Sequence, residues 1–126
     1  FATGQLIITN GSGLTFDDLA TPIKCNGWFR VRMNISGLTD FPPIAQLNQL
    51  ENTGTAFAIN LLLNSNALPV SVVNQVLIDL DSITTGYTGY SGTINLSGQT
   101  PSAPPSGAGA TAKTNLIGKG FTLITD

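Results

Sequence analysis

The stretch LLLNSNAL at residues 61–68 indicates the fold more clearly than any other part of the sequence. It fits the pattern L-x-L-x-x-N-x-L, in which Asn66 is the asparagine. Alternating leucines are typical of a strand that buries one face, and an amide side chain can both donate to and accept from the backbone of a buried turn. We therefore expect a short strand followed by a turn that Asn66 holds.

Pairs of apolar residues with one residue between them recur along the chain. Their first members, at positions 6, 33, 61, 94 and 121, are 27, 28, 33 and 27 residues apart, close to the period of about 20–29 residues in leucine-rich repeats. A unit of one strand and one connection must stack on its neighbours to bury its apolar face. The pairs are Leu6/Ile8, Met33/Ile35, Leu61/Leu63, Ile94/Leu96 and Phe121/Leu123.

This spacing predicts an α/β fold: a leucine-rich-repeat-like solenoid with a short parallel sheet of about five strands, and with helices and loops on the opposite side. The place of Asn66 is taken by Gly11, Leu38 and Gln99 in other units, so the repeats are expected to be irregular. The 126 residues predict one domain. Residues 1–27 are expected to form an irregular N-terminal cap, and residues 28–126 the repeat body.

Residues 108–117 are expected to form the last helix, which Gly118 or Gly120 ends. Two earlier connections also have a helical pattern of apolar residues. The clearer one begins after Pro69, a residue that suits the first turn of a helix, and its apolar stripe runs through residues 72–83. Asp79 and Asp81 in this segment are expected to be solvated. The weaker pattern, apolar residues at positions 44, 47 and 50, predicts a short helical turn.

The composition argues against several classes of function. Charged residues make up only 10% of the chain and the net charge is −2, so the clustered cations that bind a phosphate backbone are missing from the sequence. There is no histidine to pair with Cys25 or with a serine nucleophile. No metal-ligand cluster, cofactor motif or apolar run of about 20 residues appears. We expect a non-enzymatic protein without metal or cofactor and without membrane insertion.

The predicted sheet assigns a candidate binding face. If the apolar pairs point inward, the residues between and beside them point outward, because side chains alternate along a strand. Amides and hydroxyls on such a face can pair with sugar hydroxyls, and loop tyrosines can stack on sugar rings. The predicted ligand- or partner-binding residues are Arg32, Asn34, Asn60, Asn64, Thr93, Asn95 and Thr122 on the strands, with Tyr87 and Tyr90 in a loop.

Three phrases resemble a known group of proteins. They are LPVSVVNQVLIDLD at residues 68–81, GTINLSGQTP at residues 92–101 and ATAKTNLIGKGFT at residues 110–122. Residues 33–126 resemble degenerate leucine-rich-repeat segments near the ends of bacteriophage structural and tail-associated proteins. The resemblance implies a virion component in a tail fibre, tail tip or capsid decoration, with host attachment as its task.

The expected partners are other copies of the chain or other virion proteins, together with a host-surface glycan or protein, and no nucleic acid. Because the sequence begins at Phe1 rather than at methionine, we expect a processed product or a fragment of a longer virion protein. A secreted or cell-surface adhesin with a glycan-binding leucine-rich-repeat module fits the composition nearly as well. The localisation is therefore expected to be the virion, with the cell surface as the alternative.

Overall fold

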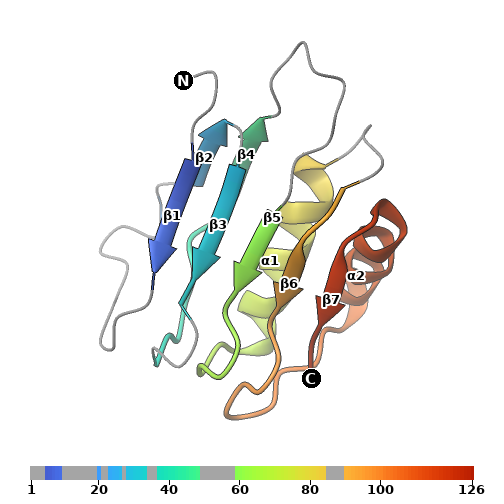
Figure 1. The fold of residues 1–126 in the computed structure, drawn as a ribbon. Helices are drawn as coiled ribbons and strands as arrows, with labels where there is room; N and C mark the ends of the chain where they lie inside the picture. Colours follow the sequence, from blue (N-terminus) through green and yellow to red (C-terminus); the bar gives the residue numbers. More distant parts are fainter. Residues whose placement is uncertain are drawn as a thin grey trace.

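The fold is a short parallel sheet with a second layer on one of its faces. The structure is a computed structural model that describes residues 5–9, 20, 23–26, 28–33, 37–48, 59–84 and 90–126. All neighbouring strands of the sheet run parallel (Figure 1). The strands, in spatial order, are β1 (Gln5–Thr9), β3 (Trp28–Arg32), β5 (Ile59–Leu62), β6 (Thr93–Asn95) and β7 (Thr122–Ile124).

Four of these strands, β3, β5, β6 and β7, include side chains that the structure describes. Together with the helices of the second layer they confirm the predicted α/β class, and they run in the predicted parallel direction. Leu61 and Leu63, the leucines of the opening stretch, are fully buried. The period-two pattern of that stretch therefore assigned the buried face correctly.

The predicted alignment of neighbouring strands is wrong by two residues between β3 and β5 and between β6 and β7, and by four residues between β1 and β3. Val31, rather than Met33, lies beside Leu61, and Leu123, rather than Phe121, lies beside Ile94. A shift by an even number of residues keeps every side chain on its own face, and of the residues predicted to point inward Met33, Leu61, Leu63, Ile94, Leu96 and Phe121 are buried and Leu123 is half-buried. Sequence periodicity therefore fixes the face of a strand but not its position along its neighbour.

The second layer consists of the helices α1 (Val70–Ile83) and α2 (Gly107–Lys119) and the parallel pair β2 (Ile23–Asn26) and β4 (Ile44–Asn48). In Figure 1 these elements lie behind the sheet, the helices behind β5 to β7 and the pair behind β1 and β3. The helix predicted after Pro69 is confirmed, and it buries Val73, Val76, Leu77 and Leu80. Neither described helix is long and apolar enough to span a membrane.

The short helical turn predicted around Ile44 is wrong, because residues 44–48 form the strand β4. Three apolar residues at intervals of three are too few to separate a turn from a strand. Tertiary contact decides the outcome: the carboxylate of Asp79 on α1 accepts a hydrogen bond of 3.0 Å from the backbone N–H of Ile44. Within residues 1–27, the strand predicted around the pair Leu6/Ile8 is present as β1, whereas the strand β2 was not predicted.

Amide side chains hold the turns that follow the strands, as the sequence of residues 61–68 predicted. Asn66 is 5% exposed; its Oδ1 accepts from Leu38 N at 3.1 Å, and its Nδ2 donates to the carbonyls of Met33 and Leu63 at 2.8 and 2.9 Å. Gln99 repeats this arrangement one strand further on. Its Oε1 accepts from Leu68 N at 3.0 Å, and its Nε2 donates to the carbonyls of Leu63 and Leu96 at 2.9 and 3.0 Å.

Asp126 adds a third acceptor at the next turn. Its carboxylate accepts from the backbone N–H groups of Gly98, Gln99 and Ala103, the last at 2.9 Å. The hydrogen bond from Ala103, followed by weaker ones from the same loop, lowers the pKa of Asp126 although burial opposes it. Asn66, Gln99 and Asp126 thus each fix the turn of the preceding unit.

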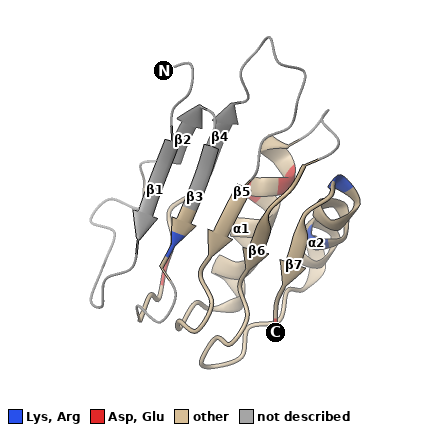
Figure 2. Ribbon diagram, viewed as in Figure 1, with Lys and Arg blue, Asp and Glu red and all other residues tan. Residues whose placement is uncertain are grey.

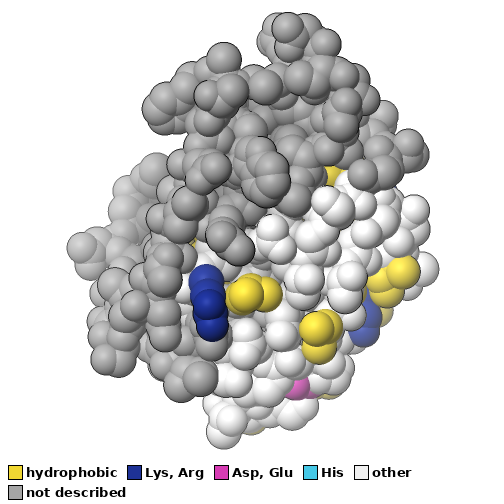
Figure 3. Space-filling model, viewed as in Figure 1, with side chains coloured by type: hydrophobic (Ala, Val, Ile, Leu, Met, Phe, Trp, Pro, Cys, Tyr) yellow, Lys and Arg dark blue, Asp and Glu magenta, His cyan; other side chains and the backbone are white. Residues whose placement is uncertain are grey.

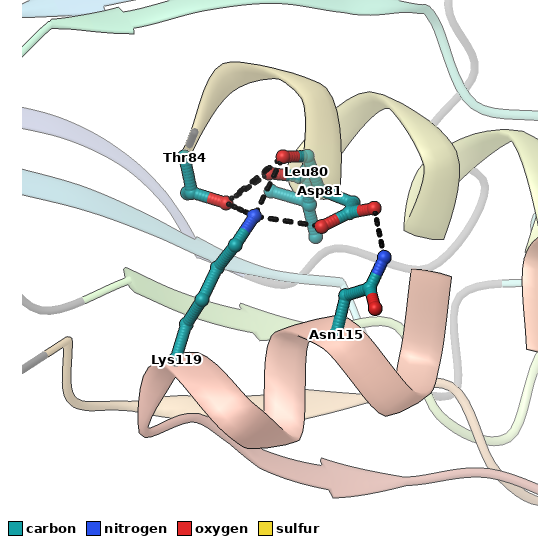
Figure 4. Close-up of polar contacts among 5 residues, drawn as sticks. All are labelled: Leu80, Asp81, Thr84, Asn115 and Lys119. Atoms are coloured by element: carbon teal, nitrogen blue, oxygen red, sulfur yellow. Dashed lines mark hydrogen bonds and ion pairs between the residues drawn. The ribbon is translucent and has the colours of Figure 1, made fainter. Parts of the chain in front are cut away.

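A polar contact fastens α2 to the C-terminal end of α1 (Figure 4). Lys119 Nζ lies 2.6 Å from Asp81 Oδ1 and donates to Asp81 O at 2.8 Å and to Thr84 Oγ1 at 2.9 Å. Asn115 Nδ2 donates to Asp81 Oδ2 at 2.9 Å. Burial alone would raise the pKa of Asp81, but the hydrogen bonds and the charge of Lys119 lower it below its usual value.

The prediction that Asp79 and Asp81 are solvated is therefore wrong for both. Asp79 binds the first residue of β4 and accepts from Gln75 Nε2 at 2.6 Å, and Asp81 binds α2. Both carboxylates hold neighbouring elements of the second layer together. The periodicity of a helix shows which side a residue occupies, but it does not show which element packs there.

Candidate functional site

The candidate site is the face of the sheet that the second layer leaves open (Figure 1). Two rows of side chains from neighbouring strands cross this face. The upper row is Asn60, Thr93 and Thr122, and the lower row is Arg32, Leu62, Asn95 and Ile124. Adjacent strands are about 4.8 Å apart, so a ligand of a few sugar units would reach several of these side chains at once.

Uncharged polar groups dominate the described part of this face. Arg32, Thr122 and Ile124 are exposed, and Asn60, Leu62, Thr93 and Asn95 are half-buried. Figure 3 views the molecule from this side; its described part is mainly white, the colour of other side chains and of the backbone, with isolated yellow and blue side chains and a magenta one near the lower edge. Figure 2 places the described acidic residues on α1 and in loops, outside the two rows.

The orientation of two asparagine amides determines which of their hydrogen-bonding groups the open face presents to a ligand. Asn60 Oδ1 accepts from the backbone N–H of Thr93 at 3.2 Å. Asn95 Oδ1 accepts from the N–H and the Oγ of Ser97 at 3.1 and 2.7 Å. Because a backbone N–H can only donate, it fixes the carbonyl oxygen of each amide toward the protein. The Nδ2 groups of Asn60 and Asn95, which donate to no described residue, are then available to a ligand.

The remaining predicted site residues differ in where the structure places them. Asn64 is half-buried and makes only a long contact of 3.5 Å with Ser65 Oγ. Asn34 and Tyr87 lie outside the described residues. Six of the nine predicted residues therefore belong to the open side of the sheet: Arg32, Asn60, Asn64, Thr93, Asn95 and Thr122.

The prediction that Tyr90 stacks on a sugar is wrong. Tyr90 is 4% exposed, and its ring stacks on Phe121 with the ring centres 5.0 Å apart. Its backbone N–H donates to Lys119 O at 3.0 Å. Tyr90 is thus part of the core beside β7. The sequence of its loop did not reveal that the ring packs between the two layers.

Sequence reasoning missed the role of Ser97. Its N–H and hydroxyl both bind Asn95 Oδ1 and so fix the direction of the Asn95 amide. The signal was present as N-x-S, since an asparagine side chain often binds the backbone two residues further on. Ser97 is therefore a positioning residue for the lower row.

The described residues contain no cluster of side chains suited to holding a metal ion. No three His, Cys, Asp or Glu side chains among them come together as a metal site. The ion pair between Lys119 and Asp81 lies in the second layer, where it joins the two helices. The two rows of the open face offer hydrogen-bond donors, hydroxyls, two aliphatic side chains and the guanidinium of Arg32.

Comparison of the chain with protein-family models, with curated proteins and with solved structures finds no match. Function is therefore inferred from the geometry and the chemistry of the open face.

Proposed function

We propose that this chain is a non-enzymatic attachment module that binds an uncharged glycan on a host surface through the open face of its sheet. One observation carries the proposal: no described element of the second layer covers this face, and the Nδ2 donors of Asn60 and Asn95 on it are not used within the described protein. The setting we favour is a virion, in a tail fibre, tail tip or capsid decoration. Its other partners are copies of the chain or other virion proteins.

The finer architecture that suits this task is a leucine-rich-repeat-like solenoid. Support comes from the equivalent hydrogen bonds of Asn66 and Gln99 in successive units. Further support comes from the alternation of a sheet strand with an element of the second layer along the chain. Such stacking builds an extended surface from short, parallel strands.

The two rows together offer polar and aliphatic contacts to a sugar ring. The Nδ2 donors and the hydroxyls of Thr93 and Thr122 are placed to pair with sugar hydroxyls. Leu62 and Ile124, on either side of Asn95 in the lower row, offer aliphatic contact to the C–H groups of a ring. Arg32 is the one charged residue of the two rows, at the β3 end, so most of the described face suits an uncharged ligand.

The test removes the donors and keeps the fold. In Asn60→Asp plus Asn95→Asp, the carboxylate oxygens still accept from Thr93 and Ser97, but the two Nδ2 donors are lost. Each hydrogen bond contributes about 0.5–1.5 kcal/mol, so we expect binding on a glycan array or to host cells to weaken by roughly tenfold or more.

The control adds the same two charges on the solvent side of α2, as Thr111→Asp plus Thr114→Asp, where both side chains are exposed. Binding in the control should equal that of the unmodified chain. Equal loss in both variants, or unchanged binding in the asparagine variant, would show that the open face is not the site.

A further inference from the structure

We infer that the glycan on the open face is an extended chain of β-linked sugars that lies across the strands, with one sugar unit over each strand. This inference rests on the proposed function and deepens it, because it names the shape of the ligand and its direction on the sheet. Any uncharged glycan that meets the two Nδ2 donors satisfies the proposed function, whereas only a flat, extended chain satisfies this inference.

The lower row carries an aliphatic side chain on every second strand from β5 to β7. Leu62 on β5, Asn95 on β6 and Ile124 on β7 lie side by side in the register of the sheet. Leu62 is half-buried and Ile124 is 42% exposed. Two strand spacings, about 9.6 Å, separate them. Leu62 and Ile124 therefore form a line of aliphatic contact across the strands, with the amide of Asn95 at its centre.

Polar side chains flank this line on both sides. On one side is the upper row. On the other side are Asn64 and Ser97, which follow β5 and β6 and are half-buried. Leu63 N donates to Asn95 O and Ser65 N donates to Ser97 O, both at 2.9 Å. These bonds continue the register of the two strands, so Asn64 lies beside Ser97 as Leu62 lies beside Asn95.

The flanking groups are neutral and of both hydrogen-bonding kinds. Asn60 contributes its Nδ2 donor. The Ser97 hydroxyl donates to Asn95 Oδ1 at 2.7 Å, so it presents lone pairs that accept from a ligand. Asp126 follows β7, but its carboxylate accepts from the backbone N–H groups of the loop 98–103. The line of aliphatic contact thus has hydroxyls and amides, rather than carboxylates, along its edges.

This arrangement matches a chain of β-linked hexoses with equatorial substituents. Such a chain is a flat ribbon whose ring faces carry C–H groups and whose edges carry hydroxyls. Neighbouring strands are about 4.8 Å apart, close to the length of one sugar unit in the ribbon. The ring faces then cover Leu62 and Ile124, and the hydroxyl edges meet the polar side chains on either side. An α-linked chain winds into a helix, which lifts some rings off the sheet.

A ligand that lies along one strand fits less well. Side chains on the same face of a strand are about 6.6 Å apart. On β5 and the turn after it they are Asn60, Leu62 and Asn64, so ring faces would lie on polar and aliphatic side chains in turn. Only the direction across the strands keeps the ring faces over aliphatic side chains and the hydroxyls beside polar ones.

The test is isothermal titration with soluble β-1,4-linked oligosaccharides of glucose, mannose and N-acetylglucosamine. The comparison series is the α-1,4-linked oligosaccharides of glucose of the same lengths. A chain of three units is the shortest that covers both Leu62 and Ile124. We expect the affinity for one β-linked series to rise by about tenfold from two to four units, as burial of one more aliphatic side chain implies. The α-linked series should bind about tenfold more weakly at four units.

Ile124→Ser separates this inference from other modes of binding. The variant should bind the four-unit chain about tenfold more weakly and the two-unit chain as before, because two units still cover Leu62. The control Ile117→Ser replaces an isoleucine of α2 that is 51% exposed, and it should bind like the unmodified chain.

Three results would overturn the inference: equal affinity for two and four units, α-linked chains that bind as tightly as β-linked ones, or no effect of Ile124→Ser. If glycans bind in any of these ways and Asn60→Asp plus Asn95→Asp still abolishes binding, the proposed function stands without the inference. If no glycan binds, both are wrong.

Discussion

Gly92→Ala is expected to lower the free energy of unfolding by about 4 kcal/mol, because it combines a strained backbone with an overlap against another strand. Gly92 precedes β6 with φ +111°, a conformation that L side chains rarely adopt. A Cβ at this position would overlap the backbone carbonyl of Ile59 on β5. A backbone atom cannot move aside as a side chain can, so β5 and β6 would have to separate. Chemical denaturation followed by circular dichroism measures the loss.

The matched control is Gly118→Ala. Gly118 lies within α2, and a Cβ there would meet no atom within 4 Å. Because glycine is unfavourable inside a helix, this substitution should stabilise the protein by about 0.5–1 kcal/mol. Equal stability of the two variants would contradict the close approach of β5 to the turn before β6.

Asn66→Ala is expected to cost about 3–5 kcal/mol, because it leaves buried backbone groups without partners at about 1–3 kcal/mol each. Leu38 N–H and Met33 C=O lose the bonds of 3.1 and 2.8 Å that the amide supplies. The carbonyl of Leu63 keeps its bond from Gln99. Thermal or chemical unfolding measures the change.

Asn64→Ala provides the comparison within the same stretch of sequence. Asn64 is half-buried and makes only a long contact with its neighbour Ser65. Its replacement should change stability by less than about 0.5 kcal/mol, as is usual away from buried polar groups. A loss as large as that of Asn66→Ala would mean that the buried amide does not hold the turns.

The sequence predicted those parts of the fold that depend on local patterns. Alternation identified the buried leucines of the opening stretch, and the single asparagine pattern predicted the buried amide of Asn66. Gln99 was aligned with Asn66 by position but was taken as a sign of irregular repeats, whereas its hydrogen bonds show that a glutamine holds the turn in the same way. These predictions succeeded because each needs only the spacing of residues within one unit.

Other features depend on contacts between distant segments. The turn near Ile44 became a strand because β2 and Asp79 lie beside it. The role of Asp126 follows from its position next to the loop of residues 98–103, which no local pattern encodes. Tyr90 is buried because Phe121, 31 positions away, lies against its ring.

The candidate face was predicted better than its chemistry. Period two placed Asn60, Thr93 and Asn95 on the correct side of the sheet. It did not show that Thr93 and Ser97 fix the direction of the two amides, because that direction depends on hydrogen bonds to neighbouring backbone. The orientation of the two amides leaves their Nδ2 donors available to a ligand.

Hydroxyl-radical footprinting of Leu62 and Ile124, with and without a bound host-surface glycan, tests the central claim most directly. Both side chains lie on the open face, whereas Val70 and Ile83 lie on α1 in the second layer. We predict that the glycan lowers the oxidation of Leu62 and Ile124 and leaves that of Val70 and Ile83 unchanged. Protection of Val70 and Ile83 with no change at Leu62 would contradict the assignment of the open face as the binding surface.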